Sequence, residues 1–437
     1  MGTMGRKRIG GFCAVAALGG LAGTAPAHAR EPVAIATAAD LGPVERGWSI
    51  DRGQFVPDLP DTADDAARRV FGSRFAGLHY WRGEGRRPVL AIHVVDATAA
   101  DLPAVDRLLD SEPLRSVTTP VRLIPARLSE RELEQGARAL APVPRGRIYG
   151  AGIDTMRNQV VVQTRPDGPL AAAAAAGRRT TPRRPSAGER RLVRRLGLPA
   201  SAVRWETGSP PRTSGTTLVT EMTGIYGGTR IWIPKVGTNT DYGCTAGWAF
   251  TNRFGRFMTT AGHCGTLNAP VYRSIPGSGA RGDQISNITT SDFNRTGGDV
   301  ATYPAAFASA RQFSGSDLRY VQAASSPQVG EWVCFQGASS QVLSCGSIAV
   351  VNYSYVPAGW NGATVGHQFC TDLQGPNASG DSGSAVWIPW FQNDQRKISL
   401  RGTLSAGGPG RICATDVATT LQQFAALPAT EEPPCSG

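Results

Sequence analysis

Three short stretches decide the fold of this chain: residues 260–264 read Thr-Ala-Gly-His-Cys, residues 297–301 read Gly-Gly-Asp-Val-Ala, and residues 380–384 read Gly-Asp-Ser-Gly-Ser. A serine hydroxyl is a poor nucleophile at neutral pH and needs a base, such as imidazole, to take its proton. A buried carboxylate fixes the tautomer of that imidazole and stabilises the imidazolium that forms. The three stretches supply these groups, so they predict a catalytic triad of His263, Asp299 and Ser382.

Each stretch alone is weak support, and the combination carries the prediction. Gly-Asp-Ser-Gly can be an ordinary turn, and a histidine beside a cysteine is usually structural. The order His, Asp, Ser along the chain is that of chymotrypsin and differs from subtilisins and α/β-hydrolases. Asp292 competes with Asp299 for the role of orienting carboxylate. Asp299 is favoured because it precedes the apolar pair Val300-Ala301, whereas Asp292 lies in a polar turn, Ser-Asp-Phe-Asn.

The chain around these stretches has the pattern of an all-β domain. From about residue 216, short runs rich in β-branched and aromatic residues alternate with Gly, Asn, Ser and Pro, and helical periodicity is nearly absent. This pattern is typical of a barrel or a sandwich. Residues 417–427 are the exception, because their apolar residues recur at helical spacing, and we expect a C-terminal helix there.

The same region resembles the bacterial branch of the chymotrypsin family, the streptogrisins and α-lytic protease. Besides the histidine and serine stretches, the resemblance rests on Ile-Tyr-Gly-Gly at 225–228, Cys-Thr-Ala-Gly-Trp at 244–248 and Ser-Ala-Gly-Gly at 405–408. It covers essentially all of 225–427. It implies two six-stranded antiparallel β-barrels with the active site in the crevice between them, and a mature N-terminus near Ile225.

The resemblance also implies a role for individual residues. His263 is the base, Asp299 its orienting partner and Ser382 the nucleophile. The backbone N–H groups of Gly380 and Ser382 form the oxyanion hole. The strand edge that pairs with the substrate backbone comprises Ser405, Ala406 and Gly407.

Seven cysteines follow the N-terminal segment, and six of them fall in sequential pairs in the C-terminal half. None lies in a C-x-x-C pair, so we expect no zinc site. Cys435 is the odd cysteine, in a Pro-rich tail. The resemblance implies three disulfides: Cys244–Cys264, Cys334–Cys345 and Cys370–Cys413.

The primary specificity pocket is where the chain departs from the family. Cys370 lies 12 residues before Ser382, a longer gap than usual, and we interpret 371–379 as an inserted loop that forms one wall of the pocket. Leu404 precedes Ser405 and is expected to face the pocket, which favours an apolar substrate side chain. Asp372 is the alternative, and it would favour a basic one.

The N-terminus has the pattern of an export signal over residues 1–29. A basic segment at 6–8 precedes a short apolar run, and Ala-His-Ala at 27–29 is a cleavage site of the A-x-A type. The apolar run is too short to span a bilayer. We therefore expect a secreted, extracellular protein, in an oxidising compartment where disulfides persist.

Net charge excludes one class of function for the C-terminal half. The chain carries +11, but residues 225–437 hold 13 Lys or Arg against 12 Asp or Glu. The basicity belongs to the first half, so removal of that half leaves a nearly neutral protein with no expected affinity for nucleic acid. If the Arg-rich half stays attached, a basic nucleic-acid-binding or surface-associated protein remains an alternative.

Residues 30–169 are predicted to form a small α/β unit without a catalytic constellation. A strand at 88–95, a helix at 97–109 capped by Asp96, and a strand at 121–124 come first. A capping box of Ser129 and Glu132 then opens a helix at 131–140, and two short strands at 148–153 and 159–163 follow. Two histidines of this unit, His79 and His93, are interpreted as packed or surface residues.

Residues 170–224 change in composition to Ala, Arg, Pro, Ser and Thr, and we interpret them as a linker and activation segment with one short basic helix at 189–196. The unit at 30–169 resembles the pro-region of the same family, which assists folding and then occludes the cleft. Barrels built from non-local strand pairs fold slowly, so a template would lower the barrier. We expect 225–437 to fold poorly without residues 30–215.

The combined prediction is a secreted serine endopeptidase, made as a proenzyme, that cleaves polypeptide substrates through an acyl-enzyme on Ser382. No cofactor, metal, nucleic acid or membrane is expected as a partner, and the mature domain, 225–437, is expected to be a monomer. The alternative is a secreted, non-catalytic binding protein on the same fold. An esterase activity is also possible, because acyl-enzyme chemistry does not require an amide.

Overall fold

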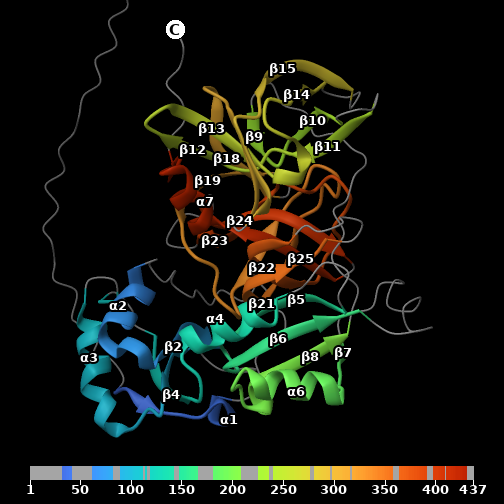
Figure 1. The fold of residues 1–437 in the computed structure, drawn as a ribbon. Helices are drawn as coiled ribbons and strands as arrows, with labels where there is room; N and C mark the ends of the chain where they lie inside the picture. The colour runs from blue at the N-terminus through green and yellow to red at the C-terminus, as the bar shows by residue number, and fades with distance from the viewer. Residues whose placement is uncertain are drawn as a thin grey trace, which may run out of the picture.

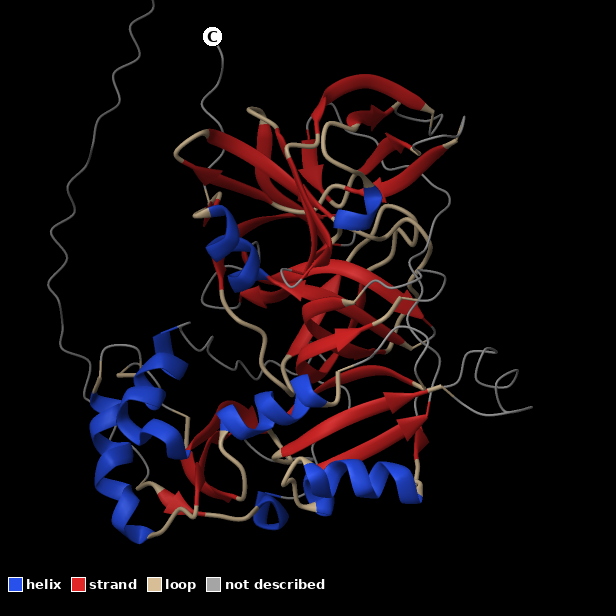
Figure 2. Ribbon diagram, in the orientation of Figure 1, coloured by secondary structure: helices blue, strands red, loops and turns tan. Residues whose placement is uncertain are grey.

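The computed structural model describes residues 32–41, 62–81, 89–111, 114–115, 119–141, 147–165, 181–207, 225–235, 240–275, 280–295, 298–314, 317–357, 364–390, 397–408 and 410–430. The expected export signal, the alanine run at 171–176 and Cys435 lie outside these residues. We call residues 32–207 the N-terminal unit and residues 225–430 the C-terminal unit. Helices concentrate in the N-terminal unit, and the C-terminal unit is built almost entirely of strands (Figures 1 and 2).

The N-terminal unit begins with a four-stranded sheet of order β1-β4-β3-β2. Strand β4 runs parallel to β1 and β3, and β2 runs antiparallel to β3. Apolar residues on one face of the sheet, such as Leu90 and Ile92, pack against Ala67 and Leu108 of two helices. The elements are β1 (Ala34–Ile35), α1 (Ala38–Leu41), α2 (Thr62–Phe71), β2 (Phe75–Trp81), β3 (Val89–Val95), α3 (Leu102–Asp110) and β4 (Val121–Ala126).

The helix expected at 97–109 begins later than its sequence pattern indicates. Thr98 and Asp101 form a capping box around a 3-10 turn at Ala99–Asp101, and α3 starts at Leu102. Asp96 has φ +50° and does not cap the helix. A side chain on a left-handed residue just before the turn does not reach the free N–H groups that a cap must satisfy.

A second sheet in the N-terminal unit has order β7-β8-β6-β5 and carries α4 and α6. The expected capping box of Ser129 and Glu132 is present at the start of α4. Val160 of the sheet packs against Leu133 of α4 and Val193 of α6. The elements are α4 (Glu130–Ala139), β5 (Ile148–Asp154), β6 (Gln159–Thr164), β7 (Thr181–Pro182), α6 (Ala187–Arg195) and β8 (Val203–Thr207).

The interpretation of 170–224 as a linker with one short basic helix needs correction over 181–207, where a helix is present but belongs to a folded sheet. Strand β8 runs parallel to β6 over five residue pairs, and α6, close to the expected basic helix, packs on the same sheet. The physical reason is a sparse apolar pattern: Val193, Val203 and Trp205 are buried, while Arg190, Arg191, Arg194 and Arg195 are exposed. These residues therefore belong to the N-terminal unit.

The two units share one sheet. Strand β5 pairs antiparallel with β21 (Ser344–Tyr355) of the C-terminal unit, with Val351 opposite Ile153 and Tyr355 opposite Gly150. This pairing continues the sheet from β7 of the N-terminal unit through β21 to β9 of the C-terminal unit. Figure 1 shows the hairpin of β5 and β6 lying directly beneath β21 and β22.

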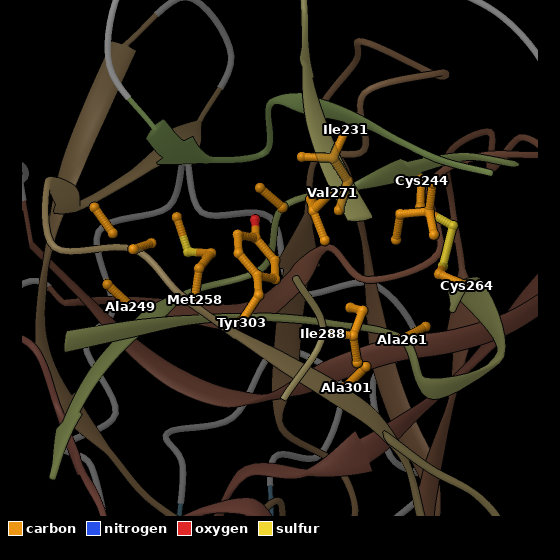
Figure 3. Packing of buried hydrophobic residues seen from close by; sticks show 14 of the residues in the cluster. Ile231, Cys244, Ala249, Met258, Ala261, Cys264, Val271, Ile288, Ala301 and Tyr303 are labelled. Atoms are coloured by element: carbon orange, nitrogen blue, oxygen red, sulfur yellow. A yellow bond between two sulfur atoms is a disulfide. The ribbon is translucent and has the colours of Figure 1, made fainter. Parts of the chain in front are cut away.

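One part of the C-terminal unit contains two sheets, of order β11-β10-β14-β15 and β16-β17-β13-β12-β26. Their inner faces enclose a core that includes Ile231, Met258, Val271 and Tyr303 (Figure 3). The strands are β10 (Arg230–Pro234), β11 (Asp241–Thr245), β12 (Ala249–Asn252), β13 (Gly255–Thr260), β14 (Pro270–Ser274), β15 (Arg281–Asn287), β16 (Thr290–Arg295), β17 (Gly298–Pro304) and β26 (Leu427–Pro428).

The other part of the C-terminal unit, which includes β9 at its start, belongs to the shared sheet. Its core centres on Phe335, Phe369 and Val386, with a neighbouring cluster around Trp248 and Trp387. The strands are β9 (Ile225–Gly227), β18 (Ala308–Ser314), β19 (Asp317–Ala324), β20 (Trp332–Phe335), β21, β22 (Val365–Leu373), β23 (Ala385–Trp390), β24 (Lys397–Gly408) and β25 (Arg411–Asp416).

A C-terminal helix, α7, spans Val417–Phe424 and is capped by Asp416. It ends three residues before the expected limit, because Ala425 adopts a left-handed conformation and Leu427–Pro428 pairs with β12. No helix in the described ranges is long and apolar enough to cross a membrane.

Candidate active site

His263 lies in a short 3-10 turn, Gly262–Cys264, that follows β13. A disulfide between Cys264 and Cys244 joins this turn to β11. The Gly262 position leaves no room for a side chain, since a Cβ there would approach the carbonyl oxygen of Asp292 to 2.5 Å. The turn is therefore fixed by a covalent bond on one side and by close backbone packing on the other.

Asp299 is fully buried at the start of β17 and forms two hydrogen bonds with His263. One carboxylate oxygen, Oδ2, accepts from Nδ1 of the ring at 2.7 Å, and Oδ1 accepts from the backbone N–H of His263 at 2.8 Å. The hydroxyl of Ser405 also donates to Oδ2, at 2.6 Å. A carboxylate only accepts hydrogen bonds, so Nδ1 must carry the proton, which leaves Nε2 as the free base on the opposite side of the ring.

Asp292, the competitor, has a different partner. It lies on β16, and its Oδ2 accepts from Nε2 of Gln423 on α7 at 2.9 Å. The structure brings Asp299, and not Asp292, to the imidazole of His263.

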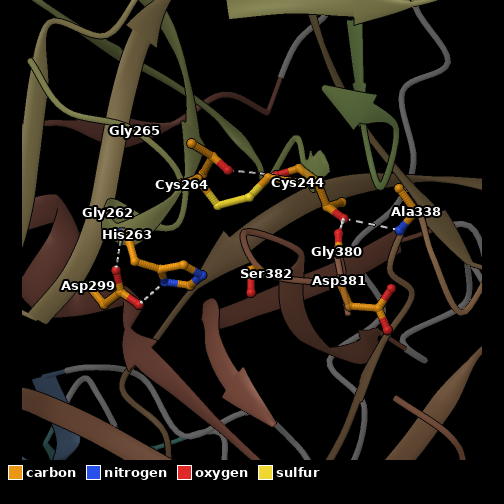
Figure 4. The surroundings of a disulfide bond; sticks show 12 residues. Cys244, Gly262, His263, Cys264, Gly265, Asp299, Ala338, Gly380, Asp381 and Ser382 are labelled. Atoms are coloured by element: carbon orange, nitrogen blue, oxygen red, sulfur yellow. Dashed lines mark hydrogen bonds and ion pairs between the residues drawn. A yellow bond between two sulfur atoms is a disulfide. The ribbon is translucent and has the colours of Figure 1, made fainter. Parts of the chain in front are cut away.

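Ser382 faces the imidazole from the side opposite Asp299, so that the ring lies between the two (Figure 4). The serine is 1% exposed, and its Oγ lies 3.5 Å from the carbonyl oxygen of Ser405, the outer limit of a hydrogen bond. The structure therefore gathers His263, Asp299 and Ser382 from three separate stretches into one place.

The turn that carries Ser382 is held by Thr245 of β11. The hydroxyl of Thr245 donates to the carbonyl oxygen of Gly380 at 2.7 Å, and its backbone N–H donates to that of Ser382 at 2.9 Å. Gly380 and Gly383 both have φ +97°, a conformation that favours glycine. The Gly-Asp-Ser-Gly spacing is thus required by the backbone of the turn.

Asp381 anchors the same turn from the other side. Its buried carboxylate accepts from the backbone N–H groups of Ser339 (3.0 Å), Ser340 (2.9 Å) and Ala378 (2.8 Å). The motif Gly-Asp-Ser-Gly therefore contains, next to Ser382, the residue that fixes the turn. This role of Asp381 was not predicted from the sequence.

The three residues at 405–407 lie on β24. Ser405 points toward Asp299, Ala406 is buried, and a Cβ at Gly407 would approach Oδ1 of Asn377 to 2.5 Å. Asn377 donates from Nδ2 to the carbonyl oxygen of Gly408 at 2.8 Å, so the loop before Ser382 is attached to this strand.

The expectations for the specificity pocket need correction. Leu404 is 2% exposed and packs in the core with Phe369 and Val386, so it does not face a pocket. Successive side chains of a strand point to opposite faces, and Ser405 takes the face toward the triad. Asp372 receives two hydrogen bonds from the guanidinium of Arg411, at 2.9 and 2.7 Å, and this ion pair neutralises it.

The segment 371–379 is also not wholly a loop. Its first three residues continue strand β22, opposite Arg411 and Ile412 of β25. Alternation of buried Thr371, exposed Asp372 and buried Leu373 is the period-2 pattern of a strand.

Three disulfides are present, with the pairs that the resemblance implies: Cys244–Cys264, Cys334–Cys345 and Cys370–Cys413. The second and third join neighbouring strands of the shared sheet. Within the described ranges, no group of three or more His, Cys, Asp or Glu residues could hold a metal ion.

No protein-family model matches this chain, and no curated protein matches it significantly. Solved structures of bacterial chymotrypsin-like serine proteases resemble 47% of it. They include Cellulomonas bogoriensis chymotrypsin (23% identity, TM-score 0.35, 98% of that chain), Thermobifida fusca protease A (20%, 0.37, 98%) and an α-lytic protease homologue, N4 (20%, 0.36, 99%). Resemblance at this level carries no functional argument.

Proposed function

We propose that the chain is a serine endopeptidase, secreted as a precursor, with Ser382 as nucleophile, His263 as general base and Asp299 as the orienting carboxylate. The observation that carries this proposal is that Asp299 accepts two hydrogen bonds from His263, with Ser382 on the far side of the ring. The sheets and helix α7 of the C-terminal unit are taken to form the two-barrel architecture, with the triad in the crevice between the barrels.

In the acylation step, Nε2 of His263 takes the proton of Ser382 as Oγ attacks the scissile carbonyl carbon. The imidazolium that forms is stabilised by Asp299, and it then gives its proton to the leaving amine. Water repeats the sequence on the acyl-enzyme, releasing the acid product and restoring the hydroxyl of Ser382. In the structure the hydroxyl of Ser382 lies 3.5 Å from the carbonyl oxygen of Ser405, and the cycle requires it to donate to Nε2 instead.

The oxyanion of each tetrahedral intermediate is assigned to the backbone N–H groups of Gly380 and Ser382. Support comes from the rigidity of the turn, which is held by Thr245 on one side and Asp381 on the other. Fixed donors aimed at developing charge contribute about 3–4 kcal/mol each. The substrate backbone is assigned to the edge of β24 at Ser405, Ala406 and Gly407, by strand addition.

The N-terminal unit is proposed to act as a folding aid and inhibitor of the C-terminal unit. Its strand β5 extends the sheet of β21, and its Gln163 accepts from the hydroxyl of Tyr353 at 2.6 Å. A preformed strand placed beside β21 supports the non-local pairing that slows β-barrel folding.

Secretion is proposed from the sequence of residues 1–29 together with the three disulfides, which persist in oxidising compartments. The proposed substrates are polypeptides, and the working form is proposed to be a monomer.

Covalent labelling tests the function directly. The processed protein should react with a fluorophosphonate at Ser382, located by peptide mapping, and the Ser382→Ala variant should not. Absence of labelling in a correctly processed, folded protein would favour the non-catalytic binding protein instead. A peptide library and a set of simple esters then separate a protease from an esterase.

A further inference from the structure

Tyr355 is a buried tyrosine at the end of β21, and its ring has no access to solvent. Its hydroxyl lies 2.7 Å from Oγ of Ser405. Ser405 in turn donates to Oδ2 of Asp299 at 2.6 Å. The three side chains therefore form a line of hydrogen bonds that ends on the carboxylate of the proposed triad.

The direction of this line follows from the number of protons. A serine hydroxyl has a single proton, and Ser405 must use it on Asp299, because a carboxylate can only accept. Tyr355 is then the donor to Ser405. Burial raises the pKa of the Tyr355 phenol well above its usual range, and the charge of Asp299 raises it further, so the phenol keeps the proton that it donates.

Asp299 also holds His263 through two hydrogen bonds, so the hydroxyl of Ser405 supplies the third. Without Tyr355, the Ser405 oxygen would lose its donor in a place closed to water. An unsatisfied buried hydroxyl is costly, and it would be free to rotate away from Asp299. When the Ser405 hydroxyl accepts a hydrogen bond from Tyr355, its O–H bond becomes more polar, and the hydrogen bond that it donates to Asp299 becomes stronger.

We propose that Tyr355 is a positioning residue of the active site, acting on Asp299 through Ser405. This rests on the proposed function, because it assumes that Asp299 orients a catalytic His263. Tyr355 touches no reacting atom. Through Ser405, it sets how strongly the Asp299 carboxylate is hydrogen-bonded, and therefore how strongly this carboxylate stabilises the His263 imidazolium.

Tyr353 provides a matched control on the same strand. It is equally buried, and its ring stacks on that of Tyr355 with centroids 6.0 Å apart. Its hydroxyl, however, donates to Gln163 of the N-terminal unit, away from the triad. Replacing either tyrosine by phenylalanine removes one buried hydroxyl, but only one of the two replacements breaks the line to Asp299.

The test uses the full chain, expressed, matured and normalised by fluorophosphonate titration. Tyr355→Phe should lower kcat about 5-fold with little change in KM, because Ser405 can then turn away from Asp299, which holds the ring of His263 in place less firmly. The acid limb of the kcat/KM–pH profile should move to higher pH, because a carboxylate with weaker donors stabilises the imidazolium more. Tyr353→Phe should leave both unchanged in matured enzyme. Equal behaviour of the two variants would overturn the proposal.

A double-mutant cycle tests whether the effect passes through Ser405. Tyr355→Phe should add nothing to Ser405→Ala, and an undiminished effect on that background would refute the relay. If Tyr355→Phe does not mature, 3-fluorotyrosine placed at position 355 keeps the ring and strengthens the donor. It should move the acid limb to lower pH, and no shift would contradict the proposal. An unlabelled wild-type enzyme would instead refute the proposed function itself.

Discussion

The carboxylate of Asp299 holds His263 at two points, the ring Nδ1 at 2.7 Å and the backbone N–H at 2.8 Å. The residue therefore fixes both the tautomer of the imidazole and the position of the turn that carries it. Replacing Asp299 by asparagine removes the negative charge but keeps the shape of the side chain, and so separates these two roles.

Asp299→Asn should lower kcat by about 10⁴-fold, because an amide NH₂ facing Nδ1 favours the wrong tautomer. The change is measured on matured enzyme with a peptide substrate. Asp292→Asn is the matched control, since Asp292 is also buried and lies on the neighbouring strand but bonds Gln423. A comparable loss of kcat in both variants would mean that the orienting carboxylate has been misassigned.

Asp381→Ala should destabilise the nucleophile turn and lower activity. The change leaves the backbone N–H groups of Ser339, Ser340 and Ala378 without this acceptor, and the buried one, Ser339, alone accounts for about 1–3 kcal/mol. Thermal unfolding and the fraction of enzyme titrated by fluorophosphonate both check it. Full titration at unchanged stability would contradict the role of Asp381 as an anchor.

Gly150→Ala should prevent the N-terminal unit from docking. A Cβ at this position would lie 1.7 Å from the hydroxyl oxygen of Tyr353 and 2.3 Å from Cζ. Gly188→Ala is the control, since the nearest atom to its Cβ is 4.0 Å away and alanine favours the helix. The yield of active enzyme measures the effect.

Tyr353→Leu tests the cause of the Gly150 effect. It removes the ring that the new Cβ would meet, so it should restore part of the yield in a Gly150→Ala background. Normal docking of Gly150→Ala would show that the strand pair does not depend on this glycine, and a loss without recovery in the double variant would show that the ring of Tyr353 is not its cause.

The N-terminal unit should lose stability as pH falls. His79 and His93 are buried side by side on β2 and β3, with ring centroids 4.8 Å apart and no hydrogen-bond partner for any of their four ring nitrogens. Burial lowers the pKa of His93 to about 4, against a small opposing effect of Asp154, and lowers that of His79 well below 6.5, with a further contribution from His93.

The sign follows from proton binding. Both histidines take up protons more readily in the unfolded chain, so stability is full above pH 6.5 and falls as pH decreases toward about 4. His93 alone accounts for a loss on the order of 2 kcal/mol by pH 5. Hydrogen exchange of β2 and β3 amides in the Ser382→Ala precursor measures it. His79→Phe with His93→Leu should flatten the dependence, whereas His367→Gln should not.

Much of the site could be predicted because each element of it has a local signature. Gly380 and Gly383 are required by positive φ, and Cys264 adjoins His263 in the sequence as in space. Leu404 was misplaced because the sequence does not show which face of β24 is directed toward the triad, and Ser405 occupies that face while Leu404 packs in the core. Tyr355 was missed because a tyrosine in a strand looks the same whether it fills a core or donates to Ser405.

The N-terminal unit was less predictable for a different reason. Residues 181–207 bury few apolar side chains, and charged neighbours hide them, so composition indicated a tether where a strand and a helix exist. Tertiary pairing of β8 with β6, over residues some forty positions apart, decides their structure. Such pairing leaves no trace in a single sequence.

Strand β21 has a further consequence for a processed enzyme. Residues 351–355 now have β22 on one side and β5 on the other. If residues before 225 are removed, as proposed, this stretch becomes an unpaired edge of the sheet that can accept a strand from another molecule. Asn352, exposed and left-handed at φ +48°, interrupts the regular ladder there. The irregularity would make the exposed edge a poor template for strand pairing between copies of the C-terminal unit.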